Sequence, residues 1–272
     1  MEKPPIVDTP ENWDLASAGY AEKVAPRLME LYADAFADRL DVNHELTALE
    51  VAAGSGAFTQ ALAKRVMSML ATDFSPGMVN ILQERFADAG NVQVELMDGM
   101  NLDLDDDLFD RAGCIFGLML FPDRAKGFSE LLRILKPGGR AVITGWAGPD
   151  RFEANGLFIA ALNQAFPDLP PPPTPPPVYS LSDLDDFKAQ MEAVGFQQVE
   201  VEYVAREMVV DSFDQFWEMA TVGAPPARFL MDRIGEDGQA KLRDALEGIL
   251  TERFGNGPIT TSNTATLGTG LK

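Results

Sequence analysis

Three acidic residues lie in or at the ends of short apolar segments, where a carboxylate can serve a ligand rather than solvent. Glu50 lies inside "TALEV", Asp73 ends "VMSMLATD" and Asp98 ends "VQVELMD". A strand that enters a buried sheet does not normally carry a charge. Glu50 therefore needs a donor from backbone amides or from a cationic group of a ligand.

A glycine turn, "AAGSGAFT", follows the first of these segments and leads into a helical stretch. Gly54 and Gly56 let a ligand approach the backbone closely, because glycine has no Cβ. A phosphate-binding loop needs a Lys-Ser/Thr pair after its glycines, whereas Ala57, Phe58 and Thr59 follow Gly56 here. A dinucleotide fingerprint needs a third glycine at Thr59, which weakens the alternative of a NAD-dependent oxidoreductase.

The positions of the other two acids indicate the kind of ligand. Asp73 lies 17 residues beyond Gly56, where a carboxylate accepts hydrogen bonds from both hydroxyls of a ribose. Asp98 is placed to accept from the exocyclic amine of a purine. No cationic residue accompanies these acids, so the site suits a nucleoside that carries positive charge and no phosphate.

The elements that must position these residues alternate between strand and helix up to Trp146. Strands are expected at "TALEV", "VMSMLATD", "VQVELMD", "RAGCIFGLML" and "RAVITGW". Helices are expected from about Phe58, from near Pro76 and over "KGFSELLRIL", which ends at "KPGG". This alternation predicts an α/β fold with a doubly wound, mostly parallel sheet, whose ligands bind beyond the carboxyl ends of the strands.

The flanking segments complete a single expected domain. We expect N-terminal helices over residues 1–46, the cofactor-binding core over 47–146, and a lid, a helical insert and closing strands over 147–272. The proline tract "FPDLPPPPTPPPVYS" is either a stiff connector or a cover over the substrate pocket. Ser182 is the expected N-cap of the following helix, and Gly195 is its expected stop.

Composition and charge exclude several classes of protein. The chain has 272 residues, a net charge of −20 and no cluster of Lys and Arg, so neither nucleic acid nor an acidic membrane is an expected partner. It lacks an apolar run of about 20 residues and a secretory signal pattern, so we expect a cytoplasmic protein. Its one cysteine, Cys114, excludes an internal disulfide and is expected to be buried.

The segments "LEVAAGSGAFT", "ATDFSPGMV", "MDGMNL" and "LLRILKPGGRAVI" together resemble the class I S-adenosylmethionine-dependent methyltransferases. This broad group contains the ubiquinone/menaquinone-biosynthesis methyltransferases and many small-molecule methyltransferases. The resemblance runs from about Leu46 to Trp146, with a further typical segment at "LDDFKAQMEAVGFQQVEVEY". One departure is Ala52, where the family usually has glycine.

The resemblance implies a seven-stranded Rossmann-like sheet, a helical cap insert, and S-adenosyl-L-methionine as cofactor with S-adenosyl-L-homocysteine as product. It assigns the ribose to Asp73, the adenine amine to Asp98 and the methionine part to the backbone of Gly54 and Gly56. Phe74 and Met78 are expected to flank the adenine, and Glu50 to support the amino-acid end of the cofactor through the turn. Phe116 and Gly117 are expected to pass under the sulfonium, and Tyr20 to reach the cofactor carboxylate. The implied cofactor-binding set is Tyr20, Glu50, Ala52, Gly54, Gly56, Asp73, Phe74, Met78, Asp98, Gly99 and Phe116.

The acceptor is a small molecule whose identity, like the atom that is methylated, the sequence leaves open. Trp146, Tyr179 and Trp217 are the candidate acceptor-binding residues. His44 precedes the first strand, at the wrong end of the sheet for a catalytic base, and no residue cluster suggests a metal. A NAD-dependent oxidoreductase, a non-catalytic protein-binding module and a homodimer stay open as alternatives.

Overall fold

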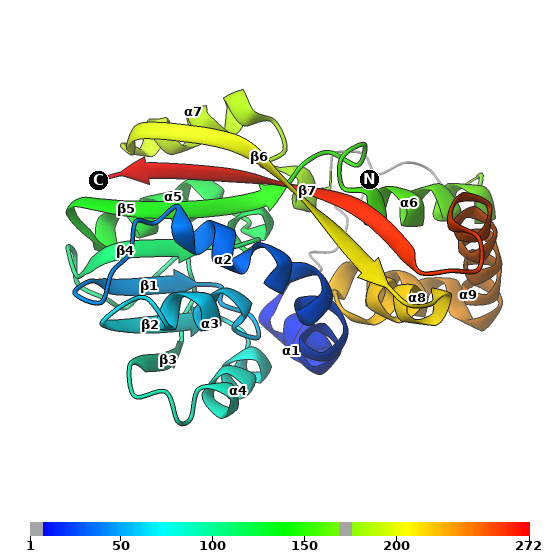
Figure 1. Ribbon diagram of the computed structural model, residues 1–272, viewed down its shortest axis with the longest axis horizontal. Helices are drawn as coiled ribbons and strands as arrows, with labels where there is room; N and C mark the ends of the chain where they lie inside the picture. The colour runs from blue at the N-terminus through cyan, green and yellow to red at the C-terminus, as the bar shows by residue number, and fades with distance from the viewer. Residues whose placement is uncertain (1–7, 169–175) are drawn as a thin grey trace.

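The computed structural model describes residues 8–168 and 176–272, and within them the chain forms one seven-stranded sheet in the order β3-β2-β1-β4-β5-β7-β6 (Figure 1). The first five strands are parallel, and β7 runs antiparallel to both β5 and β6. This confirms the predicted doubly wound, mostly parallel sheet. The strands are β1 (Thr47–Val51), β2 (Ser68–Asp73), β3 (Val92–Leu96), β4 (Phe109–Cys114), β5 (Leu135–Trp146), β6 (Gln197–Val210) and β7 (Ile259–Leu271).

Helices cover both faces of the sheet and extend beyond the carboxyl ends of its strands (Figure 1). An N-terminal run consists of α1 (Pro10–Gly19), the π-helix η1 (Tyr20–Met29) and α2 (Glu30–Asp38). The crossover helices of the core are α3 (Ala57–Ala63), α4 (Pro76–Arg85), η2 (Leu118–Leu120) and α5 (Arg124–Ile134). The later part adds α6 (Glu153–Ala165), η3 (Pro177–Tyr179), α7 (Leu184–Val194), α8 (Phe213–Val222) and α9 (Pro225–Phe254).

The central strands are buried on both faces, whereas the edge strands are largely exposed or half-buried. β1 and β2 are buried except at their first residues, which is the pattern of parallel strands covered by helices. At the two edges, β3 and β6 carry mostly exposed or half-buried residues. The glycine turn and Asp73 therefore stand at the carboxyl ends of the two best-covered strands.

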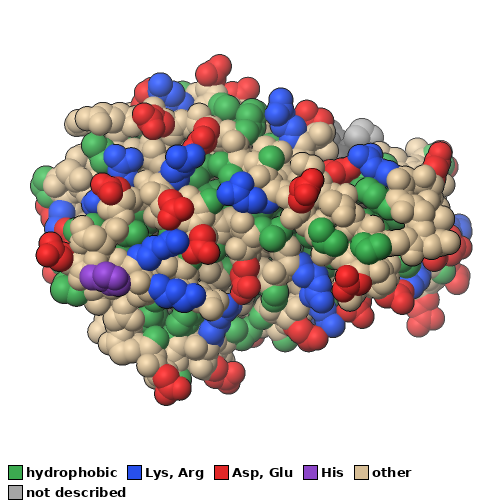
Figure 2. All heavy atoms as spheres, in the orientation of Figure 1, with side chains coloured by type: hydrophobic (Ala, Val, Ile, Leu, Met, Phe, Trp, Pro, Cys, Tyr) green, Lys and Arg blue, Asp and Glu red, His purple; other side chains and the backbone are tan. Residues whose placement is uncertain are grey.

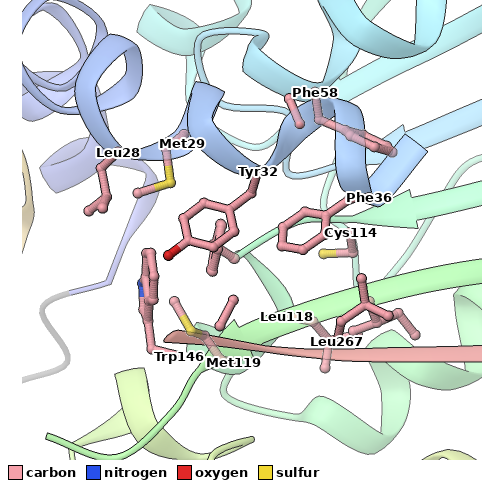
Figure 3. Close-up of a cluster of buried hydrophobic side chains, with 14 of the residues drawn as sticks. Leu28, Met29, Tyr32, Phe36, Phe58, Cys114, Leu118, Met119, Trp146 and Leu267 are labelled. Atoms are coloured by element: carbon pink, nitrogen blue, oxygen red, sulfur yellow. The ribbon is translucent and has the colours of Figure 1, made fainter. Parts of the chain in front are cut away.

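An aromatic cluster holds the N-terminal helices against the sheet (Figure 3). Trp146 stacks between Phe116 and Phe152, at 4.1 Å from each ring centroid. Tyr32 meets Phe116 and Trp146 edge-on, and its hydroxyl donates to the backbone oxygen of Asn263 at 2.5 Å. This cluster joins α2 to the carboxyl ends of β4 and β5 and buries Trp146.

Several sequence-based expectations need correction. The strand predicted over "RAGCIFGLML" ends at Cys114, because Phe116 adopts a left-handed φ of +57° and η2 follows. Asp183, rather than Ser182, caps α7 by accepting from the amide of Asp186, while Gly195 ends this helix as expected. The sequence analysis did not anticipate α6, and "KPGG" lies within β5. Residues 169–175 of the proline tract lie outside the described residues.

Candidate functional site

A cavity opens at the carboxyl ends of β1, β2, β3 and β4, and α1 and η1 cover it. It contains the predicted cofactor-binding residues except Glu50 and Gly56, namely Tyr20, Ala52, Gly54, Asp73, Phe74, Met78, Asp98, Gly99 and Phe116. Gly117, predicted to pass under the sulfonium, also lines it. The residues that the sequence analysis placed at four strand ends therefore line one cavity.

Asp73 is buried at the end of β2 with both carboxyl oxygens oriented by backbone amides. Oδ2 accepts from the amide of Gly54 and Oδ1 from that of Ser75, each at 2.9 Å. Burial raises the pKa of Asp73, and these amides partly offset that rise. Each carboxylate oxygen keeps a second lone pair, so the group can still accept from ligand hydroxyls.

Glu50 lies behind the turn rather than in the cavity. It is only 1% exposed, and the hydroxyl of Thr59 donates to its Oε2 at 2.5 Å. Burial raises the pKa of Glu50 to about 8, with Asp73 adding to the rise and Arg85 opposing it. The sequence analysis used Thr59 only as the missing third glycine; its hydroxyl in fact supplies the donor that the buried acid needs.

The two positions in the turn require glycine for different physical reasons. Both have left-handed backbones, with φ of +56° at Gly54 and +86° at Gly56. A Cβ on Gly54 would lie 3.5 Å from the ring of Tyr20, on the cavity side. A Cβ on Gly56 would lie 2.5 Å from Phe86, so packing beneath the turn, and not ligand approach, requires that glycine.

Asp98 lies in the wall of the cavity, two residues after the end of β3. Its Oδ1 accepts from the amide of Met100 at 2.9 Å, which orients the carboxyl. A Cβ on the neighbouring Gly99 would lie 2.5 Å from Val51 and 2.6 Å from Phe121. The chain after β3 is thus packed directly against β1.

The N-terminal segment contributes residues that the sequence analysis did not assign. Asp8 and Trp13 line the cavity together with Tyr20. The rings of Trp13 and Tyr20 meet edge-on at 5.7 Å. Burial, and then the charges of Asp73 and Glu50, raise the pKa of the Tyr20 phenol, which therefore stays protonated and able to donate. Only the local pattern "WDLASAGY" pointed to this region, and it singled out Tyr20 alone.

The three predicted acceptor-binding residues do not line this cavity. Trp146 and Tyr179 are 3% and 8% exposed, and Trp146 belongs to the aromatic cluster. Trp217 lies on α8, where its ring lies near Phe213 and the guanidinium of Arg243. Their aromatic character signals packing in this structure, and a role in acceptor binding stays a prediction.

The residues that line the cavity suit a ligand that carries positive charge and no phosphate. None of the described residues that line it is Lys, Arg or His. His44 is exposed near the start of β1, the purple side chain of Figure 2, at the opposite end of the sheet. On this face, basic side chains are interspersed with acidic ones (Figure 2).

Within residues 8–168 and 176–272, no group of three or more His, Cys, Asp or Glu side chains is arranged to hold a metal ion. No helix among those described is long and apolar enough to span a bilayer.

Comparisons with known proteins agree with this geometry. A family model described as "Methyltransferase domain" matches residues 48–139. A demethylmenaquinone methyltransferase of Clavibacter sepedonicus is 42% identical over 101 residues, which cover 37% of this chain and 41% of the relative. One of Staphylococcus carnosus is 30% identical over 171 residues, covering 57% of this chain and 69% of the relative. For most such relatives the match spans about half of their length.

Solved structures share the fold over nearly the whole chain. The [4+2]-cyclase SpnF superimposes with a TM-score of 0.60 and 19% identity, covering 99% of this chain and 97% of that one. At this identity the likeness concerns the fold alone. Since that protein is described as a cyclase, the fold does not by itself define a reaction.

Proposed function

The chain belongs to the class I S-adenosylmethionine-dependent methyltransferases, and from this premise we propose that it transfers a methyl group from S-adenosylmethionine to a small organic acceptor. The carrying observation is Asp73, a buried carboxylate whose two oxygens are oriented by the amides of Gly54 and Ser75 in the wall of the cavity. That arrangement suits the paired hydroxyls of a ribose. The absence of a basic side chain among the described lining residues disfavours a ligand with phosphates.

The proposed binding mode assigns each part of the cofactor to neighbouring residues. Asp73 accepts from the ribose, Asp98 from the adenine amine, and the backbone of the turn at Gly54 faces the methionine part. Phe74 and Met78 flank the adenine. Tyr20, whose protonated phenol lies over the turn, donates to the cofactor carboxylate.

When bound, S-adenosylmethionine supplies an electrophilic methyl group on a sulfonium. The chain's own contribution is to hold the acceptor in line with that methyl group and to exclude water. Phe116 and Gly117 at the end of β4 form the floor, and Trp13 and Tyr20 form part of the cover. Orientation of this kind contributes on the order of 7–11 kcal/mol to lowering a barrier.

Calorimetric titration with S-adenosylhomocysteine, with NADH in parallel, tests the proposal. We expect micromolar or tighter binding of S-adenosylhomocysteine and none of NADH. In Asp73→Asn the affinity should fall at least about tenfold, because a charge-assisted hydrogen bond contributes about 1.5–3 kcal/mol. Asp105→Asn makes the same change in an exposed loop and should bind like the wild type.

Two results would reject the proposal. Binding of NADH alone would favour the oxidoreductase alternative. Binding of neither ligand would favour a non-catalytic protein that keeps the fold, and its partners would then be the object of study.

A further inference from the structure

Asp8 is the acidic lining residue that the proposed cofactor leaves without a partner. Among the described residues, the carboxylates in the cavity wall are Asp8, Asp73 and Asp98. Asp73 and Asp98 both accept from backbone amides and both have a proposed partner on the cofactor. The Oδ1 atom of Asp8 is shielded from solvent and accepts no hydrogen bond from the residues that the structure describes.

The orientation of Asp8 is fixed by its neighbours. It immediately precedes Thr9, the N-cap of α1, so its backbone is held at the start of that helix. The side chain of Trp13 donates a hydrogen bond to the carboxyl, and Trp13 in turn packs edge-on against Tyr20. The carboxyl is therefore attached to the same aromatic pair that covers the glycine turn.

A shielded carboxyl oxygen without a donor is costly, and native structures hold such groups where a ligand or a reaction uses them. Burial raises the pKa of Asp8 above its usual value, and the hydrogen bond from Trp13 offsets part of this rise. The charged and titratable groups that share the cavity are Asp73, Asp98 and Tyr20. None of them is a base available to an acceptor, because both acids serve the cofactor and the phenol stays protonated.

We propose that Oδ1 of Asp8 accepts the proton of the acceptor's nucleophilic O–H or N–H group, so that the acceptor is a protic molecule. This inference rests on the proposed function and names the acceptor class and its base. As the nucleophilic atom bonds to the methyl carbon, the carbon–sulfur bond breaks and its electron pair stays on sulfur. The nucleophile's proton passes to Asp8, which later releases it to solvent. A positioned base of this kind contributes about 10²–10⁴-fold to a rate.

Asp8→Asn and a matched control separate this role from a structural one. The asparagine keeps an oxygen for Trp13 but can no longer take a proton. Glu11→Gln makes the same charge change on an exposed side chain of the first turn of α1. All three proteins should bind S-adenosylhomocysteine equally, which shows that the cofactor site is intact.

The first readout is binding of benzylamine, phenol and toluene to protein saturated with S-adenosylhomocysteine, measured by calorimetry. These probes are similar in size and differ in their donor group. The wild type and Glu11→Gln should bind benzylamine or phenol at least about tenfold tighter than toluene. Asp8→Asn should lose this difference. Equal responses of the wild type and Asp8→Asn to all three probes would overturn the inference.

The second readout is kinetic, over a panel of phenols and amines. In Asp8→Asn we expect kcat to fall by about 10²-fold or more with an unchanged KM for S-adenosylmethionine, and the acid limb of the pH profile to disappear. If Asp8→Asn weakens S-adenosylmethionine but not S-adenosylhomocysteine, the carboxyl serves the sulfonium instead and the inference fails. If the wild type binds no S-adenosylhomocysteine, the proposed function fails separately, and the probe comparison on unloaded protein still decides the role of Asp8.

Discussion

Glu50 is a buried acid whose protonation state depends on its packing behind the glycine turn. With its pKa near 8, Glu50 is mostly protonated at neutral pH in the folded protein. A neutral carboxylic acid beside Thr59 avoids placing a second full charge next to Asp73. The sequence identified Glu50 as unusual because of its type and place, but its protonation depends on burial that only the fold supplies.

The pH dependence of stability should reveal this proton. The folded-state pKa of about 8 exceeds the unfolded value of 4.5, so between these values the folded protein binds more protons than the unfolded chain. The free energy of unfolding therefore falls as pH rises through that window, by at most about 1.4 kcal/mol per unit from this group. Urea unfolding at about pH 5 and about pH 8.5 should show the wild type losing stability relative to Glu50→Gln. Parallel behaviour of the two proteins would refute the assignment.

At the scale of elements, the turn after β1 and the end of β4 are packed against each other through residues with unusual backbones. Ala52 has φ of +55° and Phe116 +57°, a region that favours glycine. Gly117 follows Phe116, and a Cβ added to it would lie 2.5 Å from the Cβ of Ala52. The alanine that departs from the family's usual glycine thus fills the space that Gly117 leaves empty.

A double-mutant cycle tests this contact. Gly117→Ala should destabilise the protein by about 1–3 kcal/mol through overpacking. Ala52→Gly should stabilise it or leave it unchanged, because it removes a strained left-handed alanine. In the Ala52→Gly background the cost of Gly117→Ala should be smaller, since only the sulfur of Cys114, at 3.2 Å, then crowds the new methyl group. Additive free energies of unfolding would show that the two residues do not interact.

The sequence predicted those parts of the site that local patterns encode. Strand-end acids and a glycine turn are local signals, so Asp73, Asp98 and Gly54 were found and do line one cavity. Asp8 precedes a helix in an irregular segment, and its role depends on tertiary contacts with Trp13. Trp146 stacks in the aromatic cluster, because an aromatic side chain at a strand end can equally join the core, and its role in acceptor binding stays a prediction.

For helices and strands, too, local patterns predicted some features, and long-range contacts determined the others. Alternating apolar segments gave the parallel core, but the apolar run after Cys114 continued past the strand, because Phe116 turns into the aromatic cluster. Ser182 and Asp183 are both good N-caps, so residue type alone could not decide between them. The antiparallel place of β7 between β5 and β6 arises from long-range pairing, which no local pattern specifies.

At the scale of the whole molecule, the N-terminal helices close the cavity that the sheet opens. Figure 1 shows α1 beside the carboxyl ends of the strands, next to α4. The carboxylate of Asp14 accepts a hydrogen bond from the amide of Gly77, in the first turn of α4. A Cβ on Gly77 would lie 2.6 Å from that carboxylate and 2.7 Å from the hydroxyl of Ser17, so the two helices meet closely. The covering helix α1 is thus tied to α4 by this capping contact, and we expect its loss to loosen the cover of the cavity.

Breaking this contact should accelerate ligand exchange more than it affects the chemistry. In Asp14→Ala, α4 loses an acceptor for one of its free N-terminal amides, a change that costs about 0.5–2 kcal/mol. This loss should destabilise the arrangement in which α1 contacts α4 over the cavity. S-adenosylhomocysteine should therefore dissociate about two- to thirtyfold faster, as measured by stopped-flow displacement. Amides of α1 should also exchange hydrogen faster in the complex. Asp38→Ala removes an exposed acid of α2 that faces Arg65 and should leave both measurements unchanged. Equal dissociation rates for Asp14→Ala and the wild type would mean that ligand release does not require α1 to leave α4.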